Sequence, residues 1–97
     1  MKWLWIVTAY VANSPDAVFA DGTPARWSSE CIVAAPKQIP FGTKFYVYFE
    51  EGVRVCVVKD RIGTPRDAHH LDVFMINREA AIKFGVQELA VLPVKKP

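Results

Sequence analysis

Residues 44–60 read KFYVYFEEGVRVCVVKD. Lys44–Phe49 and Val53–Lys59 are rich in aromatic and β-branched residues, which favour extended strands. Glu50, Glu51 and Gly52 lie between these segments and form a short polar turn. The stretch therefore predicts a β-hairpin.

Further strand-like segments flank the hairpin on both sides. A helix is predicted over Arg78–Phe84, with Asn77 as its N-cap and Gly85 at its end. Six short strands and one helix on so short a chain favour a small closed β-barrel, because closure leaves no free strand edges. We therefore expect one mainly β domain over residues 1–97. The additional strands are predicted at 3–10, 31–34, 70–75 and 88–94.

Composition narrows the possible functions. The chain has 97 residues and is 52% hydrophobic, which excludes a disordered tail, and no apolar run approaches the roughly 18–20 residues needed to cross a bilayer. Twelve Lys and Arg residues against 10 Asp and Glu give a net charge of +2. The basic residues are scattered along the chain, so neither a nucleic acid nor a membrane is expected as a partner.

The first twenty residues resemble a secretory signal. Lys2 precedes an apolar run from Trp3 to Ala12, and small residues precede Asp21. Thr8 and Tyr10 interrupt that run, so we predict a strand at Trp3–Tyr10 instead. No lipobox, anchor or repeat module is evident, and a phage or prophage product that reaches the cell wall is our hypothesis for location.

Cys31 and Cys56 allow at most one bridge. They lack a CxxC spacing, and we interpret them as two small buried thiols. The alternative is a disulfide that closes a 25-residue separation and stabilises the chain by about 3 kcal/mol.

Two aspartates stand out among the carboxylates. Asp60 ends a strand, and Asp72 lies in the apolar segment His70–Met75, where a carboxyl group needs a partner or a proton. A raised pKa is what a general acid at neutral pH requires. The alternative is that both carboxylates have structural roles: Asp72 accepts hydrogen bonds from backbone amides, and Asp60 pairs with Arg61 or Arg66.

Residues 11–29 form a long predicted loop, and such loops are usually functional. Thr8 and Tyr10 end the strand beside it, and Trp27 lies within it, so Tyr10 and Trp27 are candidate rings for stacking on sugars. Trp3 and Trp5 are expected in the core. His69 and His70 should point to opposite faces, with one near Asp72. No metal site is expected from them, because further ligands are lacking.

Five segments together resemble a three-aspartate ("3D") domain of the double-psi β-barrel superfamily. In order they are Val7–Tyr10, Ile39–Lys44, Val57–Gly63, Leu71–Phe74 and Glu79–Gly85. Membrane-bound lytic transglycosylase A carries a related domain, and rare lipoprotein A, expansins and family-45 endoglucanases are more distant relatives. The resemblance implies a six-stranded barrel that cleaves peptidoglycan glycan strands, with Asp72 as acid/base and Asp60 in support. Thr8, Lys59 and His70 are further candidate contacts to substrate or to Asp72.

One family residue is missing. The family's first aspartate precedes a proline, and Ala35 occupies that position here, before Pro36. A lytic transglycosylase is the leading hypothesis, on the Asp60/Asp72 spacing and the resemblance, and the missing aspartate need not abolish its activity because that mechanism needs one acid/base. A non-catalytic, expansin-like glycan-binding module and an endoglucanase-like hydrolase are the alternatives. Each takes peptidoglycan or a related β-1,4-glycan, without cofactor, and we expect a monomer.

Overall fold

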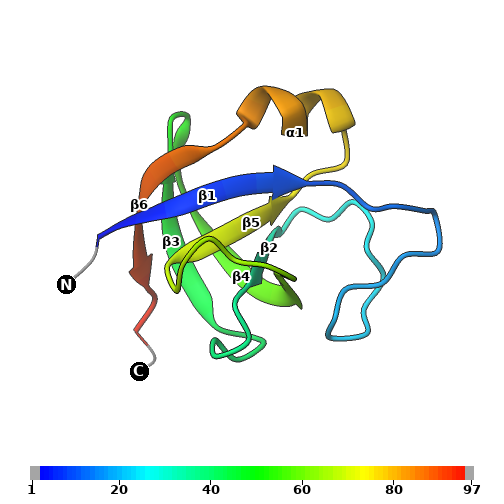
Figure 1. Ribbon diagram of the computed structural model, residues 1–97, viewed down its shortest axis with the longest axis horizontal. Coiled ribbons are helices and arrows are strands. Elements are labelled where there is room, and N and C mark those ends of the chain that lie inside the picture. The colour runs from blue at the N-terminus through cyan, green and yellow to red at the C-terminus, as the bar shows by residue number, and fades with distance from the viewer. Residues whose placement is uncertain (1–2, 96–97) are drawn as a thin grey trace.

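The computed structural model describes residues 3–95 and contains six strands and one helix. Figure 1 shows the strands wrapped around a common centre, with the helix over one end. Every predicted strand and the predicted helix are present, with ends within about two residues of the expected ones. The elements are β1 (Leu4–Tyr10), β2 (Cys31–Ala35), β3 (Lys44–Phe49), β4 (Gly52–Arg61), β5 (His70–Phe74), α1 (Arg78–Phe84) and β6 (Gln87–Pro93).

The strands close into a barrel in the order β1-β5-β2-β4-β3-β6. Pairs β1/β5 and β2/β4 are parallel, and the other neighbours are antiparallel. The predicted fold class, a mainly β closed barrel with one short helix, is therefore confirmed. No helix within residues 3–95 is long and apolar enough to cross a membrane.

Alternation along β3 decides which of its side chains fill the barrel. Phe45 and Val47 point into the core, whereas Tyr46 and Tyr48, which alternate with them, are exposed. Trp5 packs against Phe45, with ring centroids 5.2 Å apart. The expectation for Trp3 is wrong: it lies just before β1, and 55% of its surface is exposed.

The helix α1 has the predicted caps. The Asn77 side chain accepts a hydrogen bond from the Ala80 amide, and Gly85 adopts a φ of 64° at the other end. This geometry lets the chain reverse directly into β6.

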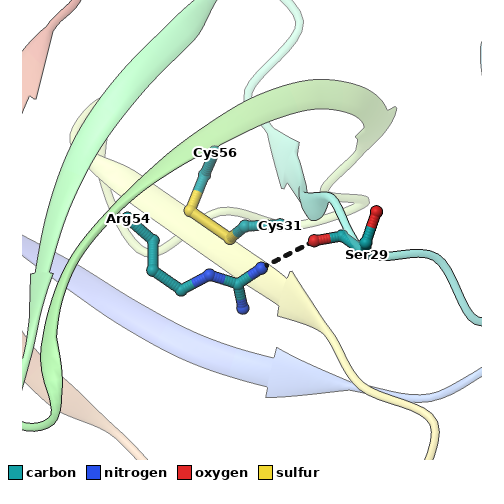
Figure 2. The surroundings of a disulfide bond; sticks show 4 residues. All are labelled: Ser29, Cys31, Arg54 and Cys56. Carbon is teal, nitrogen blue, oxygen red and sulfur yellow. Dashed lines mark hydrogen bonds between the residues drawn. A yellow bond between two sulfur atoms is a disulfide. The ribbon is translucent and has the colours of Figure 1, made fainter.

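The prediction of two free thiols is wrong: Cys31 and Cys56 form a disulfide (Figure 2). They are register partners on the parallel strands β2 and β4, and both side chains point into the barrel. Their Cα atoms lie 4.5 Å apart, within the range that a disulfide can span. Sequence spacing could not reveal this, because the pairing follows from the register of two strands joined by a long connection.

Replacing Cys31 and Cys56 together by Ala should lower the free energy of unfolding by about 3 kcal/mol, because the unfolded chain loses a cross-link across 25 residues. Urea unfolding without reductant measures this change. Dithiothreitol should bring the wild type down to the variant. Two titratable thiols in native, non-reduced protein would contradict the bridge.

Candidate functional site

The register of four neighbouring strands places Thr8, Asp72, Ala34 and Asp60 in one row across β1, β5, β2 and β4. Thr8 pairs with Asp72, Asp72 with Ala34, and Ala34 with Asp60. The residues on either side of Asp72 belong to the core, so this row lies on the outer face of the barrel wall. Two strand spacings separate Asp60 from Asp72, about 10 Å between backbones.

A bulge brings Asp60 into that row. Val33 pairs with Val58, but Ala34 pairs with Asp60, so Lys59 is an extra residue in β4. If β4 paired regularly, Lys59 would face Ala34, and Asp60, two positions after the core residue Val58, would point into the core, because side chains alternate along a strand. The bulge turns the carboxylate outward.

The long loop 11–30 folds back over the same face. The Ala20 amide donates to Asp60 Oδ1 at 2.9 Å, and the Asp21 amide donates to the Lys59 carbonyl at 3.1 Å. Phe19 is 1% exposed, and its ring meets Phe74 edge-on. The loop predicted to be functional is thus fixed on the barrel beside the two aspartates.

Asp72 is the end of a directed chain of hydrogen bonds. The Thr8 hydroxyl donates to Asp72 Oδ1 at 2.9 Å, and Thr8 Oγ1 lies 2.8 Å from His70 Nε2. Because the hydroxyl proton points to Asp72, Thr8 must accept from His70. His70 Nδ1 in turn accepts from the Arg66 amide at 3.1 Å. His70 is therefore neutral, with its proton on Nε2.

Burial sets the protonation of this group. It raises the pKa of Asp72 above its ordinary value of 3.8, with the Thr8 hydroxyl and His70 acting against that rise and the charge of Asp60 adding to it. Burial also lowers the pKa of His70 below 6.5. Both shifts favour the neutral forms of two side chains that are joined only through the Thr8 hydroxyl.

Asp60 has a different environment. Its Oδ1 accepts from the amides of Ala20 and Arg61, each at 2.9 Å, and its Oδ2 accepts from the Tyr10 hydroxyl at 2.7 Å. Burial and this hydrogen bond raise the pKa of Tyr10, so the phenol stays protonated and donates. Asp60 thus joins the loop, β1 and β4, and its carboxylate accepts from amide and phenol donors rather than pairing with Arg61 or Arg66, as the structural alternative had it.

The structure brings together Thr8, Tyr10, Asp60, His70 and Asp72, but it places Lys59 and Trp27 elsewhere. Lys59 Nζ forms an ion pair with Glu30 at 3.3 Å. Trp27 is 72% exposed and lines a cavity of about 280 Å³ beside Cys31, away from the carboxylates.

His70 is 5% exposed with both ring nitrogens engaged, so it holds Thr8 rather than presenting itself to a ligand. Its neighbour His69 lies edge-on against Trp5. The hydrogen bonds from the Arg66 and Ala20 amides could not be predicted from the sequence, because every residue type except proline has a backbone N–H. Within residues 3–95, no three His, Cys, Asp or Glu side chains gather as a metal site would require.

Two solved structures resemble this fold over the whole chain. One is the apo expansin of Clavibacter michiganensis, with a TM-score of 0.71 and 20% identity. The other is a variant of a Clavibacter michiganensis expansin in complex with cellohexaose, with a TM-score of 0.70 and 18% identity. The likeness is one of fold. This chain spans 52% of each of those chains, and no protein-family model or curated protein matches it.

Thr8→Val should destabilise the protein by about 1–3 kcal/mol, because it removes the hydroxyl and leaves Asp72 Oδ1 and His70 Nε2 without their shared partner. Thr8→Ser keeps the hydroxyl and is the matched control. Urea unfolding of both variants checks this. Equal stability of the Val and Ser variants would show that the hydroxyl holds neither neighbour.

Acidification should destabilise the fold through His70. Because the pKa of His70 in the folded protein lies below 6.5, His70 binds a proton in the unfolded chain at pH values where it stays neutral in the folded chain. The contribution of His70 to the free energy of unfolding is therefore complete above pH 6.5 and is lost as the pH falls through the folded pKa. The raised pKa of Asp72 acts oppositely: it stabilises below pH 3.8 and is lost as the pH rises through the folded pKa.

Urea midpoints measured from about pH 8 down to pH 5 test the histidine contribution. His70→Gln should flatten the dependence, whereas His69→Gln, the neighbouring histidine, should keep it. A steep profile in the His70 variant would assign the effect to another group.

Proposed function

We propose that the chain is an expansin-like, non-catalytic module that binds a β-1,4-linked glycan along the outer face carrying Asp72. The observation that carries this proposal is the unequal state of the two aspartates. Asp72 keeps an oxygen, Oδ2, without a hydrogen bond in the described part of the chain, whereas three donors hold the Asp60 carboxylate.

Glycoside hydrolysis normally needs a second carboxylate, either to activate water or to attack the sugar. Asp60 is poorly suited to either task because its donors fix it in the wall of the site. Ala35, at the position of the missing family aspartate, is fully buried and offers no carboxylate. These features disfavour the endoglucanase-like alternative.

The features that remain suit binding. Asp72 is half-buried and can exchange a hydrogen bond with a sugar hydroxyl through Oδ2. Tyr10 follows Thr8 by two residues in β1 and contributes an aromatic ring that meets Phe74 edge-on. The complex of the Clavibacter michiganensis expansin with cellohexaose supports a β-1,4-glycan as the ligand class.

A lytic transglycosylase is the second candidate, and the raised pKa of Asp72 favours it. Protonated Asp72 would donate to the glycosidic oxygen between MurNAc and GlcNAc as the bond from that oxygen to MurNAc C1 breaks, so that GlcNAc leaves with the proton. The Asp72 carboxylate would then take the proton of the C6 hydroxyl as that oxygen attacks C1, closing a 1,6-anhydro ring. The resemblance to three-aspartate domains supports this candidate and stays a prediction.

Incubation with microcrystalline cellulose and with purified peptidoglycan sacculi tests the proposal. We expect the protein in the pellet with at least one glycan, and no soluble sugar in the supernatant. Asp72→Asn should weaken binding about threefold to tenfold, because the amide keeps the shape of the side chain but puts an N–H donor in place of the Oδ2 oxygen, and one hydrogen bond contributes about 0.5–1.5 kcal/mol. Asp16→Asn, the same change on an exposed turn, should bind like the wild type.

Mass analysis of the supernatant separates the alternatives. Anhydro-muropeptides that disappear in Asp72→Asn would replace the binding proposal with the transglycosylase. New reducing ends would instead indicate hydrolysis. Absence from both pellets would overturn the glycan-binding proposal.

A further inference from the structure

A cavity of about 420 Å³ lies where the β3–β4 hairpin, the end of β5 and the end of α1 meet. Its walls include the apolar side chains of Phe49, Val53, Met75 and Phe84, and the rings of Phe49 and Phe84 lie 6.2 Å apart. The volume falls in the range of small-molecule sites. Neither Asp60 nor Asp72 lines it, although Phe74, whose ring packs on Tyr10, forms part of its wall.

Arg54 supplies the positive charge in this cavity. Its guanidinium crosses below the disulfide and donates to the Ser29 carbonyl at 3.1 Å, and its other terminal nitrogen points away from Ser29 (Figure 2). Arg54 also lines the neighbouring 280 Å³ cavity, which contains Trp27. Within residues 3–95, no carboxylate forms an ion pair with Arg54.

We propose that this hairpin-end cavity binds a small apolar molecule that carries one carboxylate, with Arg54 donating hydrogen bonds to that carboxylate. A guanidinium is planar and presents paired donors that match a carboxylate, and such charge-assisted hydrogen bonds are the strong ones. The apolar walls would cover the body of the ligand. This proposal does not rest on glycan binding.

Glu51 refines the class of ligand. It lies at the exposed hairpin tip and lines the same cavity, yet it makes no ion pair with Arg54. Its negative charge opposes anions in general, so the cavity suits one carboxylate held directly at the guanidinium and disfavours polyanions. Neutralising Glu51 should therefore strengthen binding.

Titration of ¹⁵N-labelled protein with 4-phenylbutyrate and with neutral 4-phenyl-1-butanol tests the site by amide chemical shifts. We expect the acid to bind more tightly than the alcohol and to shift the amides of Val53 and Phe84. Arg54→Gln should weaken binding of the acid about tenfold, because the lost charge-assisted hydrogen bonds correspond to at least one factor of ten.

Two further variants test the charge logic. Glu51→Gln should tighten the acid about twofold to threefold and leave the alcohol unchanged. Arg61→Gln is the matched control, because Arg61 does not line this cavity. Its guanidinium instead lies over the Phe41 ring, 3.9 Å from the ring centroid. Equal affinity for acid and alcohol, unchanged affinity in Arg54→Gln, or absence of shifts at the cavity would overturn the proposal.

Discussion

The extra residue Lys59 in β4 is the constraint on which the site depends. A regular strand would bury Asp60 beside Val58 in the core, where an aspartate costs several kcal/mol without a partner. The bulge moves that carboxylate outward, where the phenol of Tyr10 and the amide of Ala20 reach it. That contact, together with the packing of Phe19 on Phe74, fixes the long loop beside Asp72.

Much of the fold could be predicted because its signals are local. Strands followed from aromatic and β-branched runs, and the helix ends followed from Asn77 and Gly85. Asp72 stood out because a carboxyl group in an apolar strand needs an explanation. The bulge, the disulfide and the amide of Arg66 were not predictable. Each depends on which distant strand or loop lies alongside, and no residue type announces that.

Two carboxylates of the same chemistry acquire different properties from their neighbours alone. The Asp60 carboxylate receives hydrogen bonds from three elements and serves as a structural junction. Asp72 accepts one hydrogen bond, from the Thr8 hydroxyl, whose orientation is set by the neutral imidazole of His70. Its other oxygen stays available. The raised pKa of Asp72 follows mainly from its burial, and the residues that it contacts contribute less to the shift.

The strand order also determines when the site can exist. β1 pairs with β5 and β6, more than sixty residues later in the chain, so Thr8 cannot meet Asp72 until most of the polypeptide is present. Pairings so distant in sequence form slowly. By contrast, β3 and β4 are adjacent and can form their hairpin early. On a ribosome the first strand would therefore wait for its partners, and the carboxylate face would be among the last parts of the molecule to assemble.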